Sequence, residues 1–348
     1  MERVILALNC GSSSLKFGLY RSSVGGPLLV REGEAEEIGR KNSSIPDHAA
    51  ALARALESMS EAANITAVGH RIVHGGVDVR THQVLTPNVM ERLRAAVPFA
   101  PLHLPAALSV IEATERKLPK ARQVVCLDTA FHREMPPVSR TLPLSTAVRG
   151  LGVERFGFHG LSLESIVAQM DAMPDRLVVA HLGNGSSITA IRKGQSIDTS
   201  MGLTPAGGIM MGTRSGDLDP GTIIYLMRKG YERADKLEEL IDRESGLLGI
   251  SETSSDVREL LRVRAEDARA DLALKMFCYQ ARKTIASMAA ALGGLDTLVF
   301  TGGIGEHAAQ LRDEICAGLK FLGDFQVRVL PAQEDLQIAR ITGKFAAT

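Results

Sequence analysis

The chain has 348 residues, of which 45% are hydrophobic and 23% are charged, values typical of a globular protein with room for two domains. Lys+Arg and Asp+Glu both total 40, and this zero net charge argues against nucleic acid or an anionic membrane as the main partner. Trp is absent and aromatic residues make up only 4%, which disfavours a stacking platform for single-stranded nucleic acid.

The four cysteines are far apart and form no C-x-x-C pair, so we expect neither a zinc site nor a disulfide framework. Free thiols are typical of a reducing cytosol. The apolar run at the N-terminus, Val4–Leu8, is too short for a signal peptide or a membrane span. We therefore expect a cytoplasmic protein without a membrane partner.

The first predicted element is a hairpin over residues 3–20, in which an apolar strand enters a turn of glycine and hydroxyl residues. Alanine-rich periodicity predicts a helix over 47–63. A strand over 67–74 leads into a Gly-Gly turn, and Thr86-Pro87 starts a helix that continues to about Ala96.

Three prolines predict a rigid loop over 98–105, and the strand that follows, 123–127, ends at Asp128. The stretch 135–152 contains Pro, Ser and Gly without a clear period, which indicates a domain junction. A helix is expected from residue 161.

The second half of the sequence repeats the pattern of a strand followed by a glycine turn. A strand over 177–182 enters a glycine turn, and a strand over 297–300 enters another. Between them lie the glycine-rich irregular segment 200–221 and a helix over 266–292. The apolar stripe of that helix indicates core or a dimer interface rather than a ligand site.

Three glycine and hydroxyl turns therefore follow buried strands, at Asn9–Lys16, Gly183–Ser187 and Gly302–Glu306. Their backbone N–H groups suit a phosphate cradle. The recurrence indicates an α/β protein with two duplicated domains and a nucleotide cleft between them. The expected boundaries are 1–135, with 335–348 returning to the first domain, and 136–334.

A Walker A sequence and a Gly-x-Gly-x-x-Gly fingerprint are both missing from the sequence, which disfavours a P-loop enzyme and a dinucleotide-dependent oxidoreductase. Phosphate handling of the hairpin type, as in actin-like and sugar-kinase-like ATPases, remains.

Arg71, His159 and Arg214 each lie beside glycines and are candidates to stabilise a transferring phosphoryl group. Each also has a structural alternative, because such residues often cap carbonyls or lie on the surface. Asp128, at the carboxyl end of a strand, suits a cleft but could equally cap a helix.

Other polar residues give weaker signals. His70 and His74 are four apart, but their β-like context and the missing glutamate argue against zinc. Asp256 and Glu334 are on their own more typical of caps or solvated charges.

Seven motifs occur in the order found in the acetate kinase family, and they extend over nearly the whole chain, which resembles that family closely. They are Asn9-Cys10-Gly11-Ser12-Ser13-Ser14-Leu15-Lys16, His70-Arg71-Ile72-Val73-His74-Gly75-Gly76, Asp128-Thr129-Ala130-Phe131-His132, Gly157-Phe158-His159-Gly160, His181-Leu182-Gly183-Asn184-Gly185-Ser186-Ser187, Met211-Gly212-Thr213-Arg214-Ser215-Gly216-Asp217 and Gly302-Gly303-Ile304-Gly305-Glu306.

The resemblance implies the RNase H-like fold of the acetate and sugar kinase, Hsp70 and actin superfamily. It implies reversible transfer of the ATP γ-phosphate to acetate, giving acetyl phosphate and ADP, with Mg²⁺ or Mn²⁺, by a homodimer. Propionate or another short-chain carboxylate is an alternative acceptor, and a nucleotide-driven ATPase without kinase activity is a further alternative.

The resemblance also implies roles by position. Asp128 is the catalytic carboxylate, Arg71 and Arg214 hold the carboxylate and the phosphoryl group, and His159 stabilises the transition state. Ser12, Ser14 and Lys16 lie by the phosphates, and Asn9 and Glu334 by the metal. The nucleotide positions are His181, Leu182, Gly183, Asn184, Gly185, Asp256, Val257, Arg258, Gly303, Ile304, Gly305, Glu306 and His307, and the acyl pocket is Val73, Leu102, Phe158 and Pro205.

This chain departs from the family pattern at several positions. It is shorter than typical members around 143–153, and Leu163 and Leu104 stand where His and Asn are usual. Ala206-Gly207-Gly208 replaces a Leu-Glu-Gly run, and His307 replaces Asn.

Overall fold

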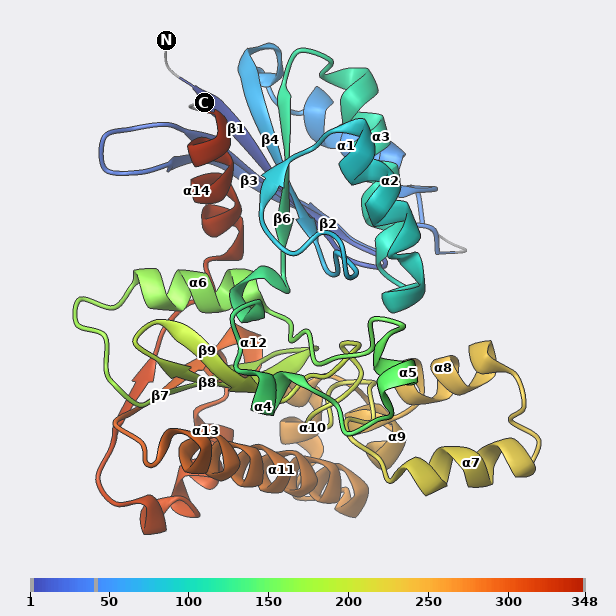
Figure 1. Cartoon of the computed structure of the whole chain (residues 1–348), viewed down its shortest axis with the longest axis vertical. Coiled ribbons are helices and arrows are strands. Elements are labelled where there is room, and N and C mark those ends of the chain that lie inside the picture. Colours follow the sequence, from blue (N-terminus) through green and yellow to red (C-terminus); the bar gives the residue numbers. More distant parts are fainter. Residues whose placement is uncertain (1–2, 41–42, 347–348) are drawn as a thin grey trace. The chain divides into compact units, whose positions relative to one another are not determined.

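The computed structural model describes residues 3–40 and 43–346 (Figure 1). The chain divides into two compact units. The first holds the described residues up to Arg133, the segment Gly160–Ala168 and the residues from Gln333 onward, and the second holds Glu134–His159 and Gln169–Ala332. The division differs from the expected boundaries mainly at Gly160–Ala168, which lies in the first unit.

The first unit is built on a six-stranded mixed sheet. Its strands are β1 (Val4–Cys10), β2 (Leu15–Arg21), β3 (Leu28–Ala35), β4 (Ile65–Ile72), β5 (Gln83–Val84) and β6 (Arg122–Leu127). They lie in the order β3-β2-β1-β4-β6-β5, with β1, β4 and β6 parallel and the other neighbours antiparallel. The predicted hairpin over 3–20 is the β1–β2 pair.

Helices cover both faces of this sheet. The helices α1 (His48–Glu57), α2 (Pro87–Ala95) and α3 (Leu104–Lys117) pack on one face, and α6 (Gly160–Ala168) and α14 (Glu334–Ala346) on the other. Successive side chains of β1 point to opposite faces of the sheet, so the strand contributes to the hydrophobic core on each face. Leu6 and Leu8 belong to one core, and Ile5 and Ala7 belong to the other.

Strand β4 approaches α14 closely at Gly69. A Cβ there would lie 2.1 Å from the Thr342 hydroxyl, so this contact requires glycine.

The second unit repeats the same topology. Its strands are β7 (Leu177–Leu182), β8 (Ser186–Arg192), β9 (Gln195–Thr199), β10 (Thr297–Thr301) and β11 (Gln326–Val329), in the order β11-β10-β7-β8-β9. The β7-β8-β9 meander is antiparallel, and β10 and β11 continue it in parallel, as β4 and β6 continue β1-β2-β3. The predicted duplication in an α/β fold is therefore confirmed.

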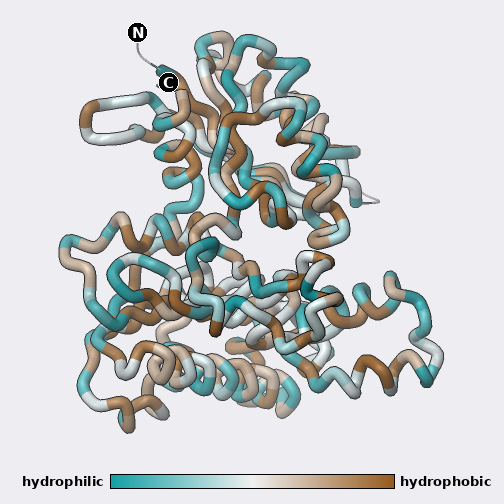
Figure 2. Tube along the Cα trace, viewed as in Figure 1, coloured by the Kyte–Doolittle hydropathy of each residue, from teal (hydrophilic) through white to brown (hydrophobic). Residues whose placement is uncertain are grey.

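The long helix α11 (Ala268–Leu292) packs against this second sheet. Asp267 caps its start through the backbone N–H of Arg269, and Gly293 ends it in a left-handed conformation at φ 74°. Figure 2 shows hydrophobic and hydrophilic residues alternating along its turns, and the predicted stripe, which includes Leu274 and Phe277, is core.

The remaining helices are short. They are α4 (Pro137–Arg140), α5 (Thr146–Arg149), α7 (Pro220–Arg228), α8 (Ala234–Arg243), α9 (Gly246–Ser251), α10 (Val257–Val263), α12 (Gly302–His307) and α13 (Ala309–Ala317), with 3₁₀ turns at Ala62–Asn64, Val97–Phe99, Ala130–His132 and Lys320–Leu322. None of the helices in the described ranges combines the length and the apolar character needed to cross a membrane.

Three local predictions need correction. The helix expected over 47–63 ends at Glu57. The expected loop over 98–105 ends in the first turn of α3, where Pro105 is tolerated because N–H groups there have no partner within the helix. The glycine run after β10 is also helical, since α12 begins at Gly302.

Candidate active site

An ion pair between a half-buried arginine and a fully buried carboxylate joins the carboxyl ends of β4 and β6 in the first unit. Arg71 donates from Nε and Nη2 to Asp128 Oδ2, at 2.9 Å and 2.6 Å. The Asp128 side chain is only 1% exposed, and its second oxygen, Oδ1, is buried without a hydrogen-bond partner among the described residues. Burial raises the pKa of the Asp128 carboxyl, and the Arg71 guanidinium opposes that shift.

Asn9 connects this pair to two further carboxylates. Its Oδ1 accepts from Arg71 Nη1 at 2.9 Å, and its Nδ2 donates to Glu334 Oε2 at 3.1 Å and to Asp335 Oδ1 at 3.2 Å. Burial raises the pKa of Asp335. The sequence reasoning missed Asp335, although an acidic pair at the start of a helix was a visible signal.

These oxygens suit Mg²⁺. Glu334, Asp335 and the second oxygen of Asp128 are hard donors, which Mg²⁺ prefers, together with waters and phosphates. No group of three or more His, Cys, Asp or Glu side chains within residues 3–40 and 43–346 is arranged to hold a metal alone. Asn9 already gives its oxygen to Arg71, and its amide orients the carboxylates.

The turn between β1 and β2 carries Ser12 and Ser14. Gly11 N donates to Ser14 O at 2.9 Å, and His48 Nε2 lies 3.0 Å from Gly11 O, so the turn is braced from outside. Lys16 is 53% exposed and pairs with Glu34 across the sheet at 3.4 Å.

In the second unit, His159 occupies a strained position. Its φ is 59°, a left-handed conformation that is uncommon for a residue other than glycine. The ring stacks on His181 with centroids 4.2 Å apart, and Nδ1 lies 3.0 Å from Ser187 Oγ. Ser187 belongs to the predicted hydroxyl turn but was not singled out.

Arg214 lies on a loop that is bonded to the last turn of α8 and to the segment after it. Thr213 Oγ1 donates to Asp242 O at 2.8 Å, and Ser245 N donates to Thr213 O at 3.0 Å. Gly246 has a φ of 63°, and a Cβ there would lie 2.2 Å from Met211 O. Glycine is thus required where this segment passes the Arg214 loop.

The glycine turns of the second unit converge on these side chains. A Cβ on Gly185 would lie 3.2 Å from His159 Nε2 and 3.3 Å from Arg214 Nη1. A Cβ on Gly302 would lie 2.7 Å from Leu182 O, at the end of the neighbouring strand. The structure therefore brings two of the three predicted glycine motifs together with His159 and Arg214, and the third, Asn9–Lys16, lies in the first unit.

Comparison with known proteins bears on this arrangement. Residues 4–335 match the acetokinase family. The acetate kinase of Rhodopseudomonas palustris (strain TIE-1) is 39% identical over 396 aligned residues, which cover 99% of this chain and 99% of that protein. The chain belongs to the acetokinase family.

Solved structures agree with this membership. The crystal structure of Porphyromonas gingivalis acetate kinase is 35% identical, with a TM-score of 0.87 and 99% of each chain covered. A propionate kinase from Francisella tularensis is 33% identical, with a TM-score of 0.92, covering 98% of this chain and 99% of that one. This acetokinase family member is a kinase that phosphorylates a carboxyl group.

Several predicted nucleotide positions have structural roles. Asp256 accepts from Arg258 N at 2.8 Å as the cap of α10 and also pairs with the Arg258 guanidinium, while the Val257 side chain is core. Glu306 Oε1 accepts from Gly302 N and from Ala332 N, both at 3.0 Å. The helix-cap alternative weighed for Asp128 is not what the structure shows, because that carboxylate binds Arg71 and Thr129 precedes the next helical turn.

The predicted acyl-pocket residues divide between the units. Val73 is buried and Leu102 half-buried in the first, and Phe158 is buried and Pro205 half-buried in the second. Pro205 also gives its carbonyl to Arg214 Nη1 at 3.0 Å. His307, which stands where the family usually has Asn, is the last residue of α12.

Proposed function

We propose that this chain is an acetate kinase, which reversibly transfers the γ-phosphate of ATP to acetate and gives acetyl phosphate and ADP. The observation that carries the proposal is the 39% identity to an acetate kinase over 99% of both chains. Each motif residue invoked below is present, and the basic ones are held by defined partners.

The chemistry needs no general base. A carboxylate is already ionised at neutral pH, since its ordinary pKa lies near about 4. The difficulty is the repulsion between this anion and the triphosphate. Arg71, Arg214, Lys16 and His159 supply positive charge and donors to offset it, as electrostatic stabilisation of a phosphoryl group in transfer.

Asp128 has a different task in this proposal. Its buried carboxylate aligns the Arg71 guanidinium, and its unpartnered oxygen Oδ1 is available to a cation or a water. Removal of this side chain would leave Arg71 without the partner that orients it. We therefore assign Asp128 to orientation of Arg71 and of the metal, not to proton abstraction.

Glu334 and Asp335 are the residues that would hold Mg²⁺, with Asn9 fixing both carboxylates through its amide. The bound metal would neutralise charge on the β- and γ-phosphates. The glycine-rich backbone at Gly183–Gly185 and at the start of α12 would allow close approach of the nucleotide, while the Gly302 N–H stays bonded to Glu306. Ser12 and Ser14 would add hydroxyl donors to the phosphates.

The test traps the product. Purified protein is incubated with ATP, Mg²⁺ and formate, acetate, propionate or butyrate, and hydroxylamine converts any acyl phosphate to a hydroxamate that is quantified alongside ADP. We expect hydroxamate and ADP in equal amounts with acetate. ADP without hydroxamate for every acid would contradict the proposal and favour a nucleotide-driven ATPase.

Propionate is the second candidate acceptor, favoured by the TM-score of 0.92 to a propionate kinase. One methylene group is worth only about 1–3 kcal/mol of discrimination, so both acids can turn over. The ratio of kcat/KM for acetate to that for propionate, measured in the same assay, decides the preferred substrate.

A homodimer is also part of the proposal. The helices α7 and α8 bury none of their own residues, and α7 exposes Ile224, Tyr225 and Met227. Such a patch is typical of an interaction surface. In sedimentation experiments we expect twice the mass of a 37.3 kDa chain. Ile224→Asp should give monomers, whereas Phe321→Asp, at an exposed site elsewhere in the same unit, should not.

The cysteines support a cytoplasmic location. All four are unpaired, and Cys10, Cys126 and Cys278 are buried. Burial raises the pKa of the Cys10 thiol to about 12, so this thiol stays protonated and unreactive at neutral pH.

A further inference from the structure

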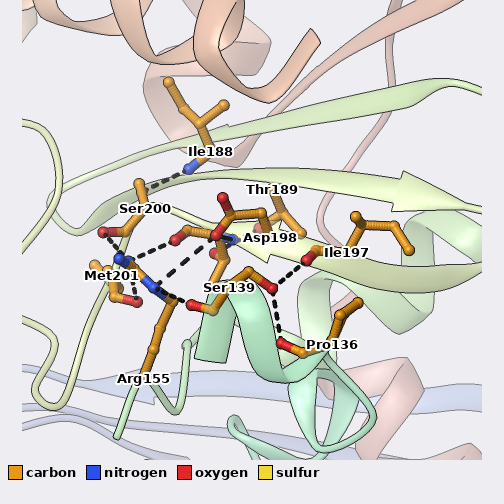
Figure 3. A network of polar contacts seen from close by, with 10 residues as sticks. Pro136, Ser139, Arg155, Ile188, Thr189, Ile197, Asp198, Ser200 and Met201 are labelled. Carbon is orange, nitrogen blue, oxygen red and sulfur yellow. Dashed lines mark hydrogen bonds and ion pairs between the residues drawn. The ribbon is translucent and has the colours of Figure 1, made fainter. Parts of the chain in front are cut away.

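Arg155 joins two segments of the second unit through backbone carbonyls (Figure 3). Its Nε donates to Ser139 O at 3.1 Å, and its Nη1 donates to Thr199 O at 2.8 Å and to Ser200 O at 3.3 Å. The Asp198 carboxylate, 3.9 Å away, balances the charge. One guanidinium thus ties the α4 segment to the end of β9.

The same network continues from β9 onto β8. Ile188 N donates to Ser200 Oγ at 3.0 Å, and Ser200 N donates to Ile188 O at 2.9 Å. Ser187 precedes Ile188 on β8, and its hydroxyl lies 3.0 Å from His159 Nδ1. The polar partner of His159 is therefore placed by the strand that Ser200 holds.

In the other direction, the chain runs from Arg155 to His159. Phe156 N donates to Gly202 O at 3.0 Å, so this segment too is fastened next to the residues that Arg155 binds. A left-handed conformation is unfavourable for a residue such as His159 and persists only where the surroundings hold it. Both His159 and its partner Ser187 thus depend on one anchored region.

We propose that Arg155 is a positioning residue for His159: its bonds to Ser139, Thr199 and Ser200 fix the distance between the segment that carries His159 and the strand that carries Ser187. The inference rests on the proposed function, in which His159 stabilises the transferring phosphoryl group. A planar guanidinium suits the task, because it offers five donors in a fixed geometry, whereas the single ammonium of lysine lacks that geometry.

The first experiment is Arg155→Met in the complete chain. A loosened His159 should lower kcat between about tenfold and a hundredfold, with the KM values for ATP and acetate nearly unchanged, because geometry in the transition state is lost rather than substrate binding. Arg155→Lys should restore little of the loss. Wild-type kcat in the lysine variant would overturn the role of the guanidinium geometry.

Arg192→Met is the matched control. Arg192 ends β8 at the opposite end from Ser187, and its Nη2 donates to the Leu292 carbonyl at 2.6 Å. The substitution therefore removes the same kind of bond without touching the His159 region. We expect its kcat to stay within about twofold of wild type, since surface changes away from special features have small effects. A similar loss of kcat in both variants would overturn the positioning role of Arg155.

A double-mutant cycle with His159→Ala tests the positioning role of Arg155 separately from the proposed function. If Arg155 acts through His159, Arg155→Met has little further effect in the His159→Ala background. Equal losses in both backgrounds would overturn the positioning role alone. Wild-type activity of His159→Ala would overturn the proposed function and, with it, this inference.

If Arg155→Met does not fold, Ser200→Ala replaces it in the same cycle. That variant removes the bond from Ile188 N to Ser200 Oγ, while the backbone bond between the two residues and the guanidinium stay in place. We expect a smaller loss of kcat in the wild-type background, again absent when His159 is alanine. Equal losses in the two backgrounds would overturn the inference here too.

Discussion

The first unit holds its arginine against a buried carboxylate, whereas the second unit holds its arginine with a backbone carbonyl. Arg71 donates twice to Asp128, whose side chain is 1% exposed. Arg214 donates to Pro205 O, and its loop is fastened through Thr213 to Asp242 O. Both guanidinium groups lie near glycine motifs, but the partner of Arg71 is a carboxylate and that of Arg214 is a carbonyl.

This difference predicts that the two arginines affect the free energy of unfolding differently, even if they affect activity alike. Removing one partner of a buried ion pair leaves the other charge uncompensated, which is strongly destabilising. Arg214 donates to a carbonyl, which carries no net charge, and the carboxylate that it stabilises, Asp242, is only half-buried. The two arginines should therefore have similar effects on catalysis and different effects on the free energy of unfolding, and the following predictions test that contrast.

Arg71→Ala should show the largest effect. We expect activity to fall by at least about a hundredfold, and the free energy of unfolding of the first unit to fall by about 3–5 kcal/mol. Urea denaturation and the hydroxamate assay measure the two quantities. The double variant Arg71→Ala, Asp128→Ala should recover part of the stability but none of the activity. An unchanged free energy of unfolding in Arg71→Ala would contradict the proposed difference between the two arginines.

Arg214→Ala should lose activity to a similar degree, by about a hundredfold or more. Its free energy of unfolding should fall by less than that of Arg71→Ala, because Asp242, the carboxylate whose raised pKa Arg214 opposes, is only half-buried, whereas Asp128 is fully buried. Near-normal turnover in this variant would remove Arg214 from the proposed mechanism. A stability loss as large as that of Arg71→Ala would show that the two sites are alike.

Thr213→Val should have an intermediate effect. It removes one hydrogen bond to Asp242 O, worth about 1 kcal/mol, and it loosens the Arg214 loop. We expect kcat/KM to fall several-fold, with Thr213→Ser close to wild type. The matched control is Thr114→Val, which removes a threonine–carbonyl bond of 2.7 Å to Val110 in the first unit. An equal loss of activity in that control would contradict the assignment.

His70→Gln should have the smallest effect, and it depends on pH. Burial lowers the pKa of His70 from 6.5 to about 4, and its Nε2 lies 2.5 Å from Gln123 Oε1. The unfolded chain therefore binds the proton first, so the wild type should lose up to about 1.4 kcal/mol of unfolding free energy per pH unit between pH 6.5 and about 4. The glutamine variant should lose less over the same range. If the unfolding free energies of the two proteins changed with pH in parallel, His70 would not be the source of the pH dependence.

Much of the fold could be predicted, because strong local patterns agree with the tertiary structure. The strands at Val4–Cys10 and Leu177–Leu182 are short apolar runs that end at glycine turns, and Thr86-Pro87 starts α2 as its cap and first residue. The helix α3 was missed, because the proline at its start, Pro105, was interpreted as a loop signal.

The candidate site was predicted less completely than the fold. Arg71, Asp128, His159 and Arg214 could be named from their glycine neighbours and from the family resemblance. Asp335 and Thr213 were not singled out. The acidic pair Glu334-Asp335 at the start of a helix was a signal, but the contacts that make these residues important, Asn9 with Asp335 and Thr213 with Asp242, join distant segments. Sequence spacing carries no information on such contacts.

The packing of α14 on β4 has a consequence for synthesis of the protein on the ribosome. Gly69 lies early in the chain, yet Thr342 and Ile338, which fill the space beside it, are translated almost last. The second unit, Glu134–His159 and Gln169–Ala332, is translated before that helix. The nascent chain must therefore leave the part of that sheet face beneath α14 uncovered throughout most of translation, and that part is where a chaperone would act.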